Sequence, residues 1–156
     1  MIKVRLQIED GNVYFTDEKY GLIYVNGDKR FAAPIREFEA TSYPEQAGKN
    51  IIPITVDEAF TYNVKFFIKA DGKLDNANNV IETFNKFLYT QNGDLKTFKQ
   101  VTLYDDYKKV KIVGYPQPIK EASEFWRDAN GIQHDVVLAE WSIEVNNPNL
   151  CDFNLK

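Results

Sequence analysis

The sequence predicts a mainly β protein: an antiparallel β-sandwich or partly open barrel with one helix packed on it. Three observations carry this prediction. Apolar and polar residues alternate over most of the chain, turn-forming residues recur at short spacing, and one segment has the period of a helix. The length of 156 residues suits one domain, so we expect residues 1–156 to form a single β-rich domain.

The composition excludes several classes of protein. The chain has 19 Lys+Arg against 23 Asp+Glu, a net charge of −4, which argues against general nucleic-acid binding. A single Cys and a single His exclude an internal disulfide framework and a Cys- or His-based metal site. There is no apolar run long enough to cross a bilayer, and the N-terminus lacks a signal-peptide core. We therefore expect an intracellular or particle-borne domain with no membrane partner.

The first third of the chain predicts short strands joined by turns. Apolar residues alternate with Lys, Arg and Gln from Ile2 to Ile8, as in a half-buried strand. The dipeptide Asn26-Gly27 tolerates positive φ at both positions and predicts a hairpin turn. The predicted strands are, in order, residues 2–8, 13–15, 21–25, 31–33 and 36–40.

Residues 41–58 have no clean period and predict a long loop, which is either functional or a wide crossover between sheets. The segment carries charges of both signs. It also has three isoleucines within four positions, which suggests that these isoleucines are buried against the parent domain or against the next subunit. We interpret it as a projecting interface loop. Its candidate interface residues are Glu45, Lys49, Ile51, Ile52 and Ile54.

The segment 59–69 is the clearest predicted strand, because five apolar or aromatic residues share one of its faces. These residues are Phe60, Tyr62, Val64, Phe66 and Ile68.

The next segment changes to a helical period and predicts a helix over about Asn76–Tyr89. Asp75 is the candidate N-cap and Gly93 the candidate stop. We expect the helix to pack its apolar stripe on the sheet. The stripe residues are Ala77, Val80, Ile81, Phe84, Phe87 and Leu88.

Four further strands are predicted in the C-terminal half. Asp105-Asp106 is interpreted as a solvated turn between the first two, and alternation places Trp141 in the core, with Trp126 nearer the surface. The strands are residues 97–104, 107–115, 119–126 and 132–145.

Residues with catalytic chemistry are few and isolated. His134 and Asp135 are neighbours in a predicted strand and point to opposite faces, so they do not form the contact that a triad needs. Cys151 has no Cys partner, and Asp105-Asp106 is at most half of a metal site. We therefore expect no catalytic residues, no metal site and no cofactor. The aromatic residues on the predicted strands are interpreted mainly as core.

The order of elements over residues 36–119 resembles the N-terminal domain of phage distal tail proteins. A strand leads into the Gly-containing loop 43–48, then come the long strand 60–68, the helix 76–88 and a hairpin over 98–114. The turn Leu103-Tyr-Asp-Asp-Tyr107 and the strand that ends in Gly114 match best.

The resemblance implies a structural protein and not an enzyme. Distal tail proteins form a ring, commonly a hexamer, that joins the tail tube to the tail tip or baseplate. The implied partners are other copies of the chain, tail tube proteins and baseplate proteins. The implied location is the virion tail, after assembly in the cytoplasm of the bacterial host. The alternative from the residues alone is a monomeric module that binds a glycan or peptide through exposed aromatics, and a small β-barrel enzyme ranks last.

Overall fold

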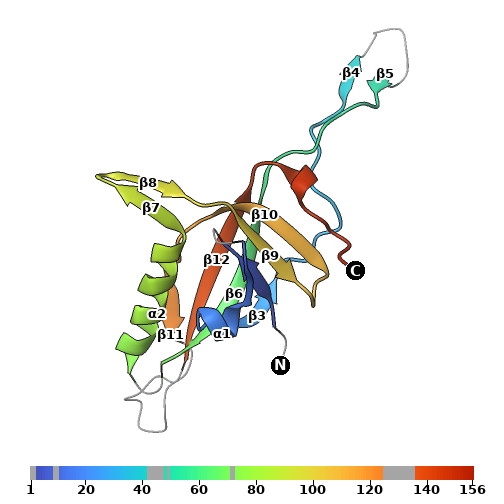
Figure 1. The fold of residues 1–156 in the computed structure, drawn as a ribbon. Helices are drawn as coiled ribbons and strands as arrows, with labels where there is room; N and C mark the ends of the chain where they lie inside the picture. The colour runs from blue at the N-terminus through green and yellow to red at the C-terminus, as the bar shows by residue number, and fades with distance from the viewer. Residues whose placement is uncertain (1–2, 9–10, 42–47, 49, 71–72, 125–135) are drawn as a thin grey trace.

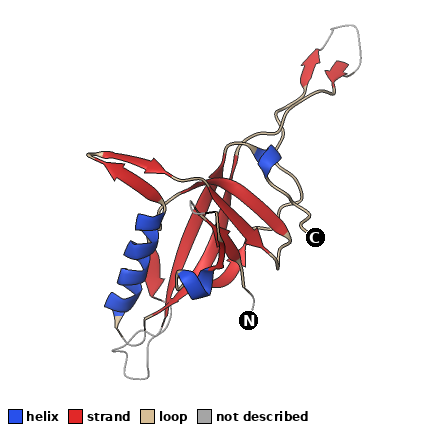
Figure 2. Ribbon diagram, viewed as in Figure 1, coloured by secondary structure: helices blue, strands red, loops and turns tan. Residues whose placement is uncertain are grey.

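The computed structural model describes residues 3–8, 11–41, 48, 50–70, 73–124 and 136–156. Figure 1 and Figure 2 show a curled sheet with one long helix along its side and two hairpins that project from it. The strands are β1 Arg5–Gln7, β2 Val13–Phe15, β3 Ile23–Gly27, β4 Glu39–Thr41, β5 Asn50–Ile52, β6 Phe60–Lys69, β7 Tyr89–Asn92, β8 Leu95–Phe98, β9 Val101–Asp105, β10 Val110–Pro116, β11 Ala122–Glu124 and β12 Val136–Val145. The helices are α1 Thr16–Lys19, α2 Leu74–Phe87 and the short 3₁₀ turn η1 Pro148–Leu150.

The described strands form one eight-stranded antiparallel sheet and two small hairpins. The sheet has the order β2-β1-β9-β10-β12-β6-β3, with β11 paired to β12, and the hairpins are β4–β5 and β7–β8. The sheet stays open, because β2 and β3 end its strand order without pairing to each other. The predicted fold class, mainly β with one packed helix, is confirmed.

The two longest strands, β6 and β12, lie next to each other in the sheet. They pair antiparallel over ten residues, from Val136 opposite Lys69 to Val145 opposite Phe60. Every second residue on each strand is buried, as the alternation predicts. The buried residues are Phe60, Tyr62, Val64, Phe66 and Ile68 on β6, and Val137, Ala139, Trp141, Ile143 and Val145 on β12.

The sheet changes partners along β10. The first part of β10, from Val110 to Gly114, pairs with β9, and its last two residues pair with β12. Gly114 sits at this crossing, where an added Cβ would collide with the carbonyl oxygen of Glu144. A side chain at residue 114 would therefore push β12 away from β10 at the point where the sheet bends.

The long helix α2 forms where predicted, with different ends. Lys73 is the N-cap and makes no side-chain capping hydrogen bond, while Asp75 lies inside the first turn, so the predicted N-cap is wrong. The helix ends at Phe87 without a glycine. Gly93 has a φ of +63° in the turn between β7 and β8, so it closes a hairpin and does not stop the helix.

The predicted apolar stripe of α2 packs on the core. Ala77, Phe84 and Leu88 are buried, and Val80 and Ile81 are partly buried against the core. Phe87, at the edge of the stripe, remains 42% exposed.

Replacing Phe84 by alanine is expected to lower the free energy of unfolding by about 3–5 kcal/mol. The side chain is 1% exposed, and its ring centroid lies 5.2 Å from that of Trp141 and 5.5 Å from that of Tyr20. A urea titration measures the effect. Phe87→Ala on the same helix is the control and should cost about 1 kcal/mol or less, because that ring is already half in water. Equal losses in the two variants would contradict the packing of the stripe.

Trp141 is 1% exposed and its indole N–H donates to the carbonyl oxygen of Gln117 at 2.6 Å. The predicted core position of Trp141 is confirmed, while Trp126 lies outside the described residues. In a Trp126→Phe variant the remaining emission comes from Trp141, and we expect iodide to quench it weakly. Quenching as strong as that of free tryptophan would contradict the burial.

Two predictions for the N-terminal third are wrong, and one element is missing from them. Asn26-Gly27 is not a hairpin turn but the end of β3, which pairs with β6 and has a bulge between Tyr24 and Asn26. Residues 31–33 are consequently not a returning strand. The short helix α1 was not predicted; it is held by Thr16, whose hydroxyl donates to the Leu22 carbonyl oxygen at 2.9 Å.

The boundaries of several other strands differ from the predictions. The single strand predicted over 97–104 is divided into β8 and β9, and β10 begins only at Val110 because residues 106–109 form the turn. Lys109 in that turn has a φ of 57°. The strand predicted over 119–126 is observed as the short β11.

Candidate assembly surface

The most distinctive feature of the surface is a two-stranded arm, defined here as residues 34–58. Figure 1 shows it extending away from the sheet, with β4 and β5 near its tip. The two strands pair antiparallel, with Glu39 opposite Ile52 and Ala40 opposite Ile51. Nearer the sheet, Ile35 and Asp57 form a further bridge. The sequence predicts a loop in this region. The pairing of β4 with β5 was not predicted.

The arm is held together by its own hydrogen bonds. The N–H of Arg36 donates to the Val56 carbonyl oxygen at 3.0 Å, and the N–H of Glu58 donates to the Pro34 carbonyl oxygen at 2.7 Å. The Thr55 hydroxyl donates to the Arg36 carbonyl oxygen at 2.7 Å. An isolated hairpin of this kind is marginally stable in water. A partner that covers it would supply the missing packing.

Apolar side chains are concentrated on and beside the arm. Of the fifteen large hydrophobic residues exposed among the described residues, seven fall between residues 31 and 56. Exposed apolar groups at such a density are typical of interaction surfaces. The seven are Phe31 at 83% exposure, Ile35 at 50%, Phe38 at 45%, Ile51 at 58%, Ile52 at 46%, Ile54 at 79% and Val56 at 56%.

Three of the five candidate interface residues can be placed in the structure. Ile51, Ile52 and Ile54 are exposed on the arm, so the body of the described chain does not bury them. Glu45 and Lys49 lie outside the described residues. Ile35 and Phe38 are exposed on the same arm but are not among the candidate interface residues, because their closeness to the isoleucines follows from a strand pairing that was not predicted.

The base of the arm is fixed to the sheet. The Asp28 carboxylate accepts a hydrogen bond from the Asn63 N–H at 3.0 Å, and the Lys29 ammonium donates to the Lys108 carbonyl oxygen at 2.6 Å. The Arg30 guanidinium lies 4.1 Å from the ring centroid of Phe60. These contacts from three successive residues fix the chain just before it enters the arm.

A buried polar cluster near this base joins β9 to β3 and β6, which are not neighbours of β9 in the sheet. The carboxylate of Asp105 on β9 accepts hydrogen bonds from the hydroxyls of Tyr24 on β3 at 2.7 Å and Tyr62 on β6 at 3.1 Å. It also accepts one from the Lys108 N–H at 2.9 Å. Asp105 is 0% exposed, so the prediction of a solvated turn is wrong for this residue. Its neighbour Asp106 is half-exposed and forms a bidentate pair with Arg5.

Gly27 is required by this cluster. A Cβ at this position would lie 2.7 Å from the Tyr62 hydroxyl oxygen and 2.9 Å from a carboxylate oxygen of Asp105. The glycine therefore permits close packing of the backbone and does not serve to turn the chain.

Burial raises the pKa of both the Tyr24 and the Tyr62 hydroxyl far above the usual value near 10. The next cause is the hydrogen bond to Asp105 for Tyr24 and the negative charge of Asp105 for Tyr62. In the unfolded chain the same hydroxyls ionise near pH 10. Above that pH the unfolded state binds fewer protons than the folded state. The stabilisation by the neutral hydroxyls is thus complete below pH 10 and is lost progressively as the pH rises above it.

We therefore expect the free energy of unfolding to fall above about pH 10 by up to ~1.4 kcal/mol per pH unit for each tyrosine. Urea titrations between pH 8 and pH 11 measure this dependence. The Tyr62→Phe variant removes one of the two groups and should show a shallower fall. Equal slopes in the variant and the unmodified chain would contradict the assignment.

Reactive groups in the described chain have structural surroundings. Burial raises the pKa of the Cys151 thiol, and the sulfur accepts a hydrogen bond from the Val113 N–H at 3.4 Å, so little reactive thiolate is present at neutral pH. The described residues contain no cluster of three His, Cys, Asp or Glu side chains suited to a metal ion. His134 lies outside the described residues. Within the described chain, no helix is both long and apolar enough to cross a membrane.

The aromatic residues divide into core and scattered surface groups. Tyr24, Phe60, Tyr62 and Phe66 are buried, as the interpretation of aromatics as core predicts. The exposed Phe15, Tyr107 and Tyr115 lie on three different elements: β2, the turn after β9, and β10. Their distribution gives less support to a single aromatic platform than the arm gives to an assembly surface.

Comparison with known proteins identifies the fold. No model of a known protein family and no curated protein matches the sequence. Among solved structures, the chain is similar to the Dit protein (gp 19.1) of phage SPP1, described as a paradigm of the hub adsorption apparatus in phages that infect Gram-positive bacteria. The TM-score is 0.57 and the sequence identity is 16%. The likeness covers 93% of this chain and 50% of the Dit chain, so this chain spans about half the length of that protein. The Dit-like fold predicted from the sequence resemblance is confirmed.

Proposed function

We propose that this protein is a structural component of a phage or prophage tail: a ring-forming distal tail protein that joins the tail tube to the tail tip or baseplate. The observation that carries the proposal is the Dit-like fold, which extends over nearly the whole chain. In this proposal residues 1–156 act as one domain, with no enzymatic activity and no cofactor.

The arm supplies the contact between subunits. A closed ring needs head-to-tail contacts, in which one surface meets a different surface of the neighbour. The arm suits this role because it projects from the sheet and exposes Ile51, Ile52 and Ile54. Full burial of each isoleucine would contribute about 1.5–3 kcal/mol, from which the cost of ordering the partners is subtracted. Glu45 and Lys49 complete the proposed interface.

The partners of such a ring are other copies of the chain, tail tube proteins on one side and baseplate proteins on the other. Its place is the virion tail, and its assembly takes place in the cytoplasm of the bacterial host. The monomeric aromatic-binding module is the competing function, and it requires neither self-association nor a place in a particle.

Immunogold electron microscopy of particles from the source phage or induced prophage tests this function. We expect the label at the end of the tail tube, where the tip or baseplate begins, and peptides of the protein in the mass spectrum of purified tails. Label elsewhere on the particle, or purified tails without the protein, would contradict the proposal. The gene neighbourhood gives an independent check, since tape-measure and tail tube genes are expected beside this gene.

A further inference from the structure

A second apolar surface lies at the end of the molecule opposite the arm. Two adjoining hollows of about 290 and 210 Å³ open between α2 and the segment formed by α1 and the start of β3. They share Val80, which lines both, and we call the pair the α1–α2 groove. Its apolar lining consists of Tyr20, Gly21, Ile23, Ile68, Val80, Phe84 and Phe87.

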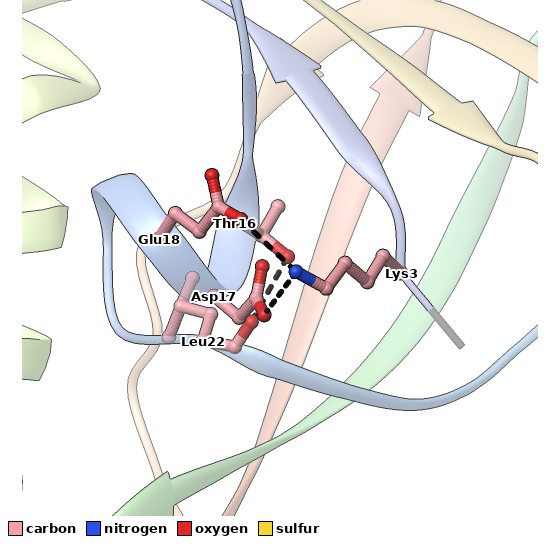
Figure 3. Close-up of polar contacts among 5 residues, drawn as sticks. All are labelled: Lys3, Thr16, Asp17, Glu18 and Leu22. Carbon is pink, nitrogen blue, oxygen red and sulfur yellow. Dashed lines mark hydrogen bonds and ion pairs between the residues drawn. The ribbon is translucent and has the colours of Figure 1, made fainter. Parts of the chain in front are cut away.

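The charges around the groove are arranged asymmetrically. Figure 3 shows the Lys3 ammonium between the carboxylates of Asp17 and Glu18, at 3.3 and 3.0 Å. The single ammonium compensates only one of these two negative charges. Lys19 and Lys69, which also line the hollows, bring the sum of the five charges to +1, so the rim of the groove is weakly basic.

One carboxylate oxygen at the groove lacks a partner within the described chain. The Oδ1 atom of Asp17 is buried and accepts no hydrogen bond from the described residues, and the Asp17 side chain is 18% exposed. Asp17 lines the larger hollow. An unpaired buried acceptor is destabilising, so α1 carries a local cost in free energy at the edge of this hollow.

The arm is complementary to the α1–α2 groove in its apolar side chains and in its charge. It exposes a row of isoleucines, and among its described residues four acidic groups accompany the single cation Arg36. Its backbone offers unpaired edges, because β4 and β5 pair only with each other. In Figure 1 the arm extends from one end of the molecule, while α1 and α2 lie at the other. The arm therefore cannot enter the groove of its own chain. The acidic groups are Glu37, Glu39, Asp57 and Glu58.

We propose that the α1–α2 groove is the socket that receives the arm of a second copy of this chain. The proposal rests on the proposed function and adds the receiving surface to it. Apolar side chains of the arm fill the two hollows, and its acidic groups face Lys19 and Lys69. Since arm and socket are different surfaces at opposite ends, each subunit offers one of each, and a closed ring satisfies all of them.

Cysteine cross-linking tests the socket directly. In a Cys151→Ser background, Ile54→Cys is placed on the arm and Thr83→Cys on the rim of the groove; both native side chains are exposed, so the core is not disturbed. A short bismaleimide should link the subunits of this double variant into a ladder of dimers, trimers and larger species. The matched control replaces Thr83→Cys by Glu82→Cys, one residue along the same helix and outside the groove. We expect a severalfold lower yield, because successive residues of a helix point in directions about 100° apart and Glu82 lines a different hollow.

The outcomes separate the socket from the proposed function. Assembled protein that yields no ladder with Thr83→Cys, or an equal ladder with Glu82→Cys, overturns the socket and leaves an arm-mediated ring intact. Protein that sediments as a monomer at every concentration overturns the ring itself, and the socket with it. A ladder specific to Thr83→Cys that Val80→Arg abolishes, in a variant with unchanged circular dichroism, supports the socket.

Discussion

Replacing Asp105 by alanine should lower the free energy of unfolding by about 3–5 kcal/mol, a large fraction of the stability of an ordinary domain. The carboxylate is fully buried and accepts hydrogen bonds from two tyrosine hydroxyls and one backbone N–H. Alanine would leave all three donors without their acceptor. Since Tyr24 and Tyr62 come from β3 and β6, the substitution removes the hydrogen bonds that link β9 to these two strands. A guanidinium titration followed by circular dichroism measures it.

Asp106→Ala is the matched control, one residue away on the chain. Asp106 pairs with Arg5 at the surface, where both side chains are about two-fifths exposed, and the expected cost is below about 1 kcal/mol. The contrast between two adjacent aspartates isolates the effect of burial from that of charge. Equal stability of the two variants would show that the buried cluster does not hold the sheet together.

Shortening the arm should abolish self-association without unfolding the protein. Removing residues 44–52 deletes the tip of the hairpin with Ile51 and Ile52, while the core residues of β6, β12 and α2 are untouched. A milder variant replaces Ile51, Ile52 and Ile54 by serine. If each isoleucine contributes about 1.5 kcal/mol to a contact, the triple substitution weakens that contact by about 4.5 kcal/mol, or roughly two-thousandfold.

The control for the arm is Leu95→Ser, which removes an equally exposed side chain from the β7–β8 hairpin. Leu95 is 75% exposed, close to the 79% of Ile54. Circular dichroism should be unchanged in all three variants, and only the two arm variants should lose association in sedimentation velocity. An unfolded shortened protein would place the arm in the core, and association equal to that of the unmodified chain would refute the interface role.

The elements that the sequence predicts well are those with long periodic patterns. The strands β6 and β12 repeat their alternation over ten residues each, and α2 repeats its stripe over fourteen. Each pattern is long enough to identify the buried face without knowledge of the partner. For this reason the positions of Trp141 and Phe84 follow from the sequence.

The wrong predictions concern residues whose role depends on the fold around them and not on the local sequence pattern. Asn26-Gly27 has the chemistry of a hairpin turn, but Gly27 is needed because the hydroxyl of Tyr62 lies against its backbone. Asp105 resembles a solvated turn residue until β3 and β6 bring two hydroxyls to it. Gly93 has the left-handed conformation of a helix stop, yet it closes the next hairpin. The partners of Gly27 and Asp105 are far away in sequence, so local patterns do not reveal them. The hairpin around Gly93 is local, and the error there is the assignment of the glycine to the helix before it and not to the turn that it forms.

The candidate surface shows the same division. Three isoleucines within four positions are visible in the sequence and indicate an interaction surface. The neighbours that extend it, Ile35 and Phe38, come from the opposite side of the arm and become apparent only once that arm is known to be paired. The α1–α2 groove combines residues from α1, β3, β6 and α2, and no local pattern in the sequence predicts it.

Native mass spectrometry of the purified protein tests whether this chain assembles into a ring through its arm. We expect one discrete assembly whose mass is a whole multiple of that of the chain, and its replacement by the single-chain mass when residues 44–52 are removed. A single-chain mass for the unmodified protein at every concentration, or an unchanged assembly in the shortened variant, would contradict the account.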